Sequence, residues 1–374
     1  MALSATQQES LALPPRQNRL LEFWKVFAQN RLAVLGLYLF VLFFIVAFIG
    51  WLLTYGDSPW LDPAKVRLQE KLLPPLSEPR SLSLSAESAP PLGVFVLGTD
   101  NLGRDVLARM LQGAWVSLTV GFVAVGISVF VGIIMGGIAG YFGQNRFSLD
   151  AMLKTLGLVL AGGLWWLHLP APALVAAGFT GAYWLAAFKL PRISVALQSK
   201  GISVDTLVMR FVDIMLCFPS FFLILTVIAL LPASIYNIMI VIGLTSWMGT
   251  ARFVRAEFLS LREQDFVTAT KALGLGHTRI IFQHMLPNAV APVMVSATIG
   301  IATAILTEAG LSFLGFGVPP PQATWGNILS EGKNYLFDAP WLTLIPGLAI
   351  LIVVLAFNLF GEGLRDALNP RLRK

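Results

Sequence analysis

Long runs without charged residues alternate with short charged segments along the whole chain. Six of these runs meet or approach the roughly 20 apolar residues that a helix needs to cross a bilayer. They are residues 32–56, 110–145, 155–188, 214–251, 280–307 and 339–361. A soluble helix of this length would carry a polar face to remain in water. The pattern therefore predicts an all-α polytopic membrane protein.

Composition agrees with this prediction and narrows the class of protein. Hydrophobic residues form 56% of the 374 residues and charged residues form 12%, about half the share found in a soluble domain. The single cysteine, Cys217, excludes internal disulfides and cysteine-based metal sites. The net charge of +6 lies mostly in segments that flank the spans, so it predicts membrane orientation and not nucleic-acid binding.

The distribution of basic residues predicts which ends of the chain face the cytoplasm. Four basic residues lie in the segment 1–31 before the first run, and four lie in the tail 363–374. The positive-inside rule then places both termini in the cytoplasm. The segment 1–31 does not resemble a cleavable signal, so we expect the first span to be retained. The expected spans are 33–54, 115–142, 206–231, 236–254, 288–308 and 341–360.

Two groups of residues stand out, one in the external loop and one in the second span. The external loop 56–114 ends in a motif where Asp100, Arg104 and Asp105 can form an ion-pair cluster. We favour an anchor for the loop over a substrate contact, because a loop clip is the more frequent arrangement. In the second span, small residues recur every four positions, which lets another helix approach closely in lipid. They are Gly132, Gly136 and Gly140.

Glu308 lies near the outer end of the fifth span. An acidic side chain at membrane depth is a candidate for a solute pathway. Anchoring at the membrane interface is the equal alternative for this residue.

The stretch 265–288 is a polar, charged island between two apolar runs. It opens with an amphipathic segment and continues past Gly274 and Gly276, which end a helix at low cost. A second short helix over 278–286 is expected to stop at Pro287, which lacks an N–H. The small residues of this helix–turn–helix would let another protein approach closely. They are Thr268, Ala269, Ala272 and Gly274.

The island resembles the cytoplasmic coupling loop of ABC importer permeases, which contacts the ATPase. The residues of the island that we assign to coupling are Asp265, Thr268, Ala269, Thr270, Gly274, Leu286 and Pro287. The usual motif has an acidic residue where Thr268 stands and an aliphatic one where His284 stands. For this stretch taken alone, an ordinary loop between spans is the alternative.

Two more blocks resemble the C-type permease subunit of dipeptide and oligopeptide importers. They are the loop segments 97–109 and 309–326, and the chain end 356–370 also fits. The resemblance covers roughly residues 24–143 and 205–370, with the blocks in the family order.

The resemblance implies a type I permease core of six spans in a bacterial inner membrane. It also implies a second, homologous permease, two ATP-binding subunits and an extracytoplasmic solute-binding protein as partners. ATP would be bound by those partners, and this chain would be a transporter subunit without catalytic residues, metal or cofactor. No Walker A, H-E-x-x-H or G-x-S-x-G motif occurs in the sequence. The expected cargo is di- or oligopeptides, with nickel, glutathione or another small solute as the alternative.

Residues 144–204 depart from the family pattern. Two apolar pieces, 149–168 and 173–192, would each form a helix of ~30 Å, the thickness of one bilayer core. Because both flanks are expected on the same side, the insertion would cross an even number of times. We therefore expect eight membrane helices, with a peripheral and dispensable hairpin; a re-entrant or cytoplasmic hairpin is the alternative.

The expected organisation follows from these assignments. It comprises the cytoplasmic segment 1–31, the first two spans over 32–143, the inserted hairpin 144–204, the permease core 205–362 with its coupling loop 255–288, and the tail 363–374.

Overall fold

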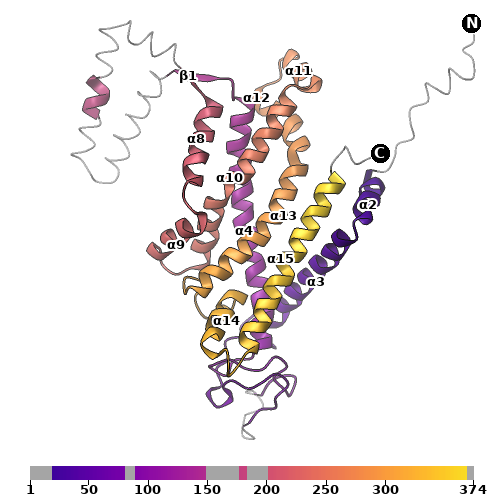
Figure 1. The fold of residues 1–374 in the computed structure, drawn as a ribbon, viewed down its shortest axis with the longest axis vertical. Coiled ribbons are helices and arrows are strands. Elements are labelled where there is room, and N and C mark those ends of the chain that lie inside the picture. The colour runs from indigo at the N-terminus through magenta and orange to yellow at the C-terminus, as the bar shows by residue number, and fades with distance from the viewer. Residues whose placement is uncertain (1–18, 81–88, 149–176, 183–200, 369–374) are drawn as a thin grey trace, which may run out of the picture. The chain divides into compact units, whose positions relative to one another are not determined.

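The computed structural model describes residues 19–80, 89–148, 177–182 and 201–368 (Figure 1). Within those ranges, five helices are long and apolar enough to cross a membrane, and a bent helix pair raises the number to six. The five are α3 (Arg31–Thr54), α4 (Val106–Tyr141), α10 (Ile235–Arg262), the continuous helix His277–Phe313 and α15 (Trp341–Leu368). This result confirms the predicted all-α membrane fold and agrees with a core of six spans.

The described chain forms two compact units. The first unit comprises the described parts of 1–129, 220–247 and 290–374. The second unit comprises those of 130–219 and 248–289. Three long helices, α4, α10 and α13 (Leu286–Phe313), contribute residues to both units.

In the first unit, α3 and α15 lie side by side (Figure 1). Gly36 permits this approach, since a Cβ at this position would lie 2.7 Å from atoms of α15. Before α3, the amphipathic helix α2 (Arg19–Gln29) buries Phe27 against Ala33 and Ala367. The start of α3 and the end of α15 are thereby held together by an apolar cluster.

The loop 55–105 joins α3 to α4, and its described apolar side chains Leu61, Leu73 and Phe95 are buried. It contains one 3-10 turn, η1 (Leu68–Glu70), among its described residues. The structure begins α4 at Val106, earlier than the predicted span 115–142. Arg109 lies in this added part of the helix, and two carboxylates neutralise its charge.

The predicted third span, 206–231, is broken into two helices. These are α8 (Val204–Leu216) and α9 (Ser220–Leu230), which form the bent pair. The prediction of one continuous span was therefore wrong. Pro219 explains the break, because it has no N–H to donate and disfavours helical geometry at the preceding residue.

The glycine stripe of α4 packs closely against α10 inside the second unit. A Cβ at Gly132 would lie 2.7 Å from the Thr250 Cβ, and one at Gly136 would lie 2.8 Å from the Val254 Cβ. At Gly140 the distance to a β-carbon of α10 would be 2.5 Å. These positions agree with the predicted role of the stripe, because any larger side chain would push the helices apart.

Two short strands lie at the two ends of the inserted segment. β1 (Arg146–Ser148) pairs antiparallel with β2 (Gly201–Ser203), which makes Ser148 and Gly201 direct partners. Next to this ribbon, the Val204 N–H donates to the Asn145 carbonyl oxygen. The predicted hairpin helices 149–168 and 173–192 lie outside the described residues, except for 177–182, which are helical.

Between α13 and α15 the chain forms a short helix, α14 (Trp325–Gly332), and the 3-10 turn η3 (Lys333–Tyr335). α14 packs on α15 (Figure 1). A capping box begins it: Thr324 Oγ1 accepts from the Asn327 N–H at 3.1 Å, and Asn327 Oδ1 accepts from the Thr324 N–H at 3.0 Å. This helix was not predicted from the sequence, although the Thr-x-x-Asn spacing signals its start.

Candidate functional site

The polar island 265–288 lies in the second unit and begins with a short helix. α11 (Asp265–Ala272) follows closely after the end of α10, so the expected loop 255–288 is helical over its first residues. Asp265 places a negative charge in the first turn of α11, where the helix dipole favours it. Gly274 ends the helix with a φ of +74°, a conformation that glycine adopts without strain.

The second half of the island differs from the prediction. α12 (His277–Arg279) continues through the π-helical segment η2 (Ile280–Met285) into α13, so the helix does not stop at Pro287. In the π-helical segment N–H groups bond five residues back, as the Leu286 N–H does to Ile281. This change of register comes directly before Pro287, whose missing N–H would interrupt an α-helical ladder.

α11 presents a small-residue surface to the outside of the chain. We call this the α11 surface; its members, all exposed, are Thr268, Ala269, Ala272 and Gly274. Val267 is completely buried, and it holds the other side of the helix in place. Leu273 extends the surface with an apolar side chain that is 78% exposed. The helix is therefore fixed on one face and open on the other.

The remaining residues assigned to coupling take intermediate positions. Asp265 and Pro287 are exposed, whereas Thr270 and Leu286 are half-buried. The motif thus runs from the start of α11, through the turn that follows it, to the start of α13. A role in coupling stays a prediction at this point.

Two ion pairs join α8 to α10 in the second unit. Arg255 forms a bidentate pair with Asp205, with Nη2 donating to Oδ2 at 2.5 Å. Arg252 Nη2 donates to Asp213 Oδ1 at 2.7 Å. A pair within α8, Arg210 with Asp213, is longer at 3.9 Å and more exposed. The stronger partners of α8 therefore come from α10, the helix that leads into the island.

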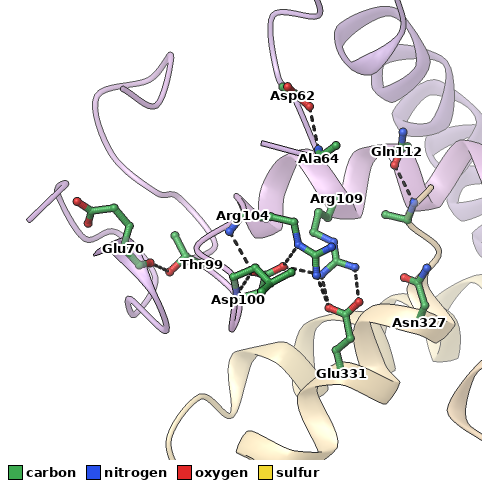
Figure 2. Close-up of polar contacts among 12 residues, drawn as sticks. Asp62, Ala64, Glu70, Thr99, Asp100, Arg104, Arg109, Gln112, Asn327 and Glu331 are labelled. Carbon is green, nitrogen blue, oxygen red and sulfur yellow. Dashed lines mark hydrogen bonds and ion pairs between the residues drawn. The ribbon is translucent and has the colours of Figure 1, made fainter. Parts of the chain in front are cut away.

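In the first unit, four charged side chains form a buried network (Figure 2). Asp100 Oδ2 accepts from Arg104 Nε and from Arg109 Nη1, both at 2.6 Å. Glu331 of α14 accepts from Arg104 Nη2 at 2.7 Å and from Arg109 Nη2 at 3.0 Å. The side chain of Asp100 is 0% exposed and that of Arg109 is 3% exposed. The network therefore ties the end of the loop 55–105 and the start of α4 to α14.

Asp105, the third residue of the predicted cluster, lies apart from this network and caps α4. Its Oδ1 accepts from the Leu107 N–H at 2.8 Å. Burial raises the pKa of the Asp105 carboxyl, while hydrogen bonds from the Leu107 and Ala108 N–H groups and the charge of Arg67 oppose the rise only in part. Asp105 thus fixes the helix start and not the loop-to-α14 connection.

Glu308 is buried inside the first unit, with 1% exposure. Its Oε1 accepts hydrogen bonds from Ser312 Oγ at 2.7 Å and from Thr324 Oγ1 at 2.9 Å. Its Oε2 has no hydrogen-bond partner within the described chain. Because Thr324 is the N-cap of α14, this carboxyl group connects α13 to α14. A position on a solute pathway stays a prediction for Glu308.

Comparison with known proteins decides the family. Residues 193–374 match the binding-protein-dependent transport system inner membrane component, and residues 19–75 match the N-terminal TM domain of oligopeptide transport permease C. The dipeptide transport system permease protein DppC of Alkalihalophilus pseudofirmus is 34% identical over 352 residues, which cover 94% of this chain and 90% of that protein. The chain belongs to the DppC/OppC permease family.

Other DppC/OppC proteins match over similar lengths. The di/tripeptide transport system permease protein DppC of Pseudomonas aeruginosa is 35% identical over 353 residues, covering 94% of this chain and 92% of that protein. The oligopeptide transport system permease protein OppC of Bacillus subtilis is 29% identical over 358 residues, covering 95% and 92%. Membership of this family makes the chain a transmembrane permease subunit.

Several residues of the charged network and of the α8–α10 ion pairs were not predicted from the sequence. Glu331 is one of two charged residues between 309 and 337, and an isolated acidic residue in such a stretch signals a basic partner elsewhere. Arg109 belongs to the loop segment 97–109, for which no role of this residue was predicted, and no role was predicted for Arg252 or Arg255 either. In the part of the chain that the structure describes, no three His, Cys, Asp or Glu side chains gather as a metal site.

Proposed function

We propose that this chain is one of two homologous permease subunits in an ATP-driven peptide importer. The α11 surface carries the proposal, because it is an exposed, small-residue surface in a DppC/OppC-family chain. An ATP-binding subunit docks on it, and two such subunits bind and hydrolyse the ATP. Relatives are named for dipeptide, di/tripeptide or oligopeptide transport, and these names support peptides as the cargo.

The proposed orientation places the α11 surface and both termini in the cytoplasm of a bacterium. Basic side chains gather in and before the island, as the positive-inside rule requires of a cytoplasmic segment. They are Arg252, Arg255, Arg262, Lys271 and Arg279. The loop 55–105 then faces the opposite side of the inner membrane, where an extracytoplasmic binding protein delivers the peptide. This chain itself needs no cofactor.

The described contacts support a mechanical role for the island. When the ATP-binding subunits close on ATP, they displace α11, and the chain passes that displacement to the spans. α10 receives it directly, and the bidentate Arg255–Asp205 pair passes it to α8. The peptide path then opens alternately to the two sides of the membrane, with no covalent step in this subunit.

Two substitutions on the α11 surface test the docking. Ala269→Arg and Gly274→Asp add bulk and charge to exposed small residues without touching a span. Gly274→Asp also strains the turn, because Gly274 has a positive φ, so Ala269→Arg is the decisive variant. Both variants should insert normally, lose the ATP-binding subunits during purification of the tagged complex, and abolish uptake of radiolabelled dialanine. Ala64→Arg, an exposed alanine of the loop 55–105, is the matched control and should keep the ATP-binding subunits bound.

Retention of the ATP-binding subunits and of uptake in both island variants would remove the docking assignment. A separate result tests whether peptides are the cargo. If the unmodified importer takes up nickel or another small solute and ignores dialanine, the docking stands and peptides are not the cargo.

A further inference from the structure

Tyr141, the last residue of α4, contacts both helices of the island. Its side chain is buried within the second unit. Its hydroxyl oxygen lies 2.8 Å from His277 Nδ1, a hydrogen-bond distance, and His277 is the first residue of α12. The Lys271 ammonium of α11 lies 5.7 Å from the centre of the Tyr141 ring, within the range of a cation–π contact. One side chain of α4 therefore reaches both sides of the turn between α11 and α12.

The turn between these two contacts contains two glycines and is loosely packed. Gly274 has a positive φ, and a Cβ built at Gly274 or Gly276 would meet no atom within 4 Å. A turn that contains two glycines and is not packed around its α-carbons resists a change of angle only weakly. α11 also packs directly on η2, but in the turn itself a displacement of α11 could be absorbed in part before it reaches α12 and α13.

The α4 end of the contact is held firmly. Gly136 and Gly140 bring the last turns of α4 against α10, with backbone and β-carbon atoms in close approach. Phe142 adds a second aromatic neighbour to His277, with ring centres 5.6 Å apart. Tyr141 therefore projects from a fixed helix end onto a weak turn.

We infer that Tyr141 is a positioning residue, which fixes the angle between α11 and α12 and links both to α4. Displacement of α11 then moves α4 and α12 together and is not lost in the glycine turn. The link to transport rests on the proposed docking of the ATP-binding subunit on the α11 surface. The fixed angle itself does not depend on that docking.

A distance measurement in the full-length chain tests the angle directly. Spin labels on cysteines at Thr268 and Thr278, both exposed, report the separation of α11 and α12 in a Cys217→Ser background. Tyr141→Leu removes the hydroxyl and the aromatic face, so the distance distribution should broaden clearly. Tyr141→Phe keeps the face and the buried volume, so its broadening should be smaller. Tyr38→Leu, at an exposed tyrosine of α3, should leave the distribution unchanged.

An unchanged distribution in Tyr141→Leu overturns the inference whatever the importer does. If that variant fails to fold, Tyr141→Phe and His277→Ala decide in its place. Tyr141→Phe removes only the hydrogen bond, whereas His277→Ala also removes the ring contacts of His277 with Tyr141 and Phe142. Distance distributions identical to that of the parent in both variants refute the role of the bond. In the reconstituted importer, dialanine uptake per ATP hydrolysed should fall roughly fivefold in Tyr141→Phe, the shift expected from one lost hydrogen bond. The ATP-binding subunits should remain bound, which separates this result from a failure of the docking proposal.

Discussion

Arg109 shows how a charge near the end of a membrane helix can be a requirement of the fold. It lies in the first turns of α4, and both of its carboxylate partners come from other parts of the chain, Asp100 from the loop and Glu331 from α14. Removing the guanidinium would leave Asp100 buried beside one remaining cation, Arg104. A residue that looks like part of a solvated loop motif in the sequence therefore joins the first turns of α4 to the loop and to α14.

We expect Arg109→Ala to destabilise the chain by about 3–5 kcal/mol, the usual cost of breaking a buried ion pair from one side. Thermal and denaturant unfolding of the purified chain in detergent measure the change. Arg210→Ala is the control, because the Arg210 side chain is 77% exposed and its pair contributes only about 0–1 kcal/mol. Equal, small losses in both variants would show that the network adds little to stability.

Asp105 predicts a pH dependence with a definite sign. Burial raises its pKa, so the folded state binds this proton more tightly than the unfolded chain does. The contribution of Asp105 to stability is therefore greatest below the unfolded pKa of about 3.9 and is lost as the pH rises through the folded pKa. Asp105→Asn removes the titration and keeps an oxygen that can cap α4.

The difference in unfolding free energy between Asp105→Asn and the parent should therefore move in favour of the variant as the pH rises from acid to neutral. Unfolding curves of both proteins are measured across that range. In the difference between their unfolding free energies, the contributions of the other titrating groups cancel. A difference that moves toward the parent instead would mean that the charge of Arg67 outweighs burial at this site.

At the level of elements, the β1–β2 ribbon makes a prediction about the inserted segment. Its pairing sets Ser148 opposite Gly201, the spacing of two residues that a tight hairpin turn can join. We therefore expect that replacing residues 149–200 with Asn-Gly leaves α4 and α8 in place. The shortened chain should keep the unfolding temperature of the parent within a few degrees and, in the complete importer, retain dialanine uptake.

Loss of stability in that shortened chain would show that the segment 149–200 is part of the core. Loss of uptake with unchanged stability would assign the segment a role in transport. Replacing the same residues with a longer Gly/Ser linker provides the control, since it removes the segment without imposing a tight turn.

Features of a helix that depend only on its own sequence were predictable. Features that depend on the elements packed around the helix were less predictable. The length of each apolar run predicted the spans, and four-residue spacing predicted the contact face of Gly132, Gly136 and Gly140. The bend before α9 was also readable, because Pro219 stands inside the predicted span. The π-helical segment before Pro287 was not, since both an ended helix and a shifted register satisfy the same proline.

For the molecule as a whole, the order of spans and the position of the island were visible in the sequence, whereas the cross-chain partners were not. Asp100 and Arg104 are neighbours in sequence, so their pairing could be expected. Glu331 and Arg255 join their partners only after several spans have packed, and no local pattern records that arrangement. The α11 surface could be predicted because all of its small residues lie in one short segment of the sequence.

The β1–β2 ribbon also has a consequence for the order of folding. Closing a loop as long as 149–200 costs about 3.5 kcal/mol of chain entropy, more than a ribbon of three residue pairs supplies by itself. The strands can therefore pair only after α4 and α8 have met, when Ala139 and Val204 pack together and bring the two ends close. The ribbon is then a late product of helix packing and cannot be what brings α4 and α8 together.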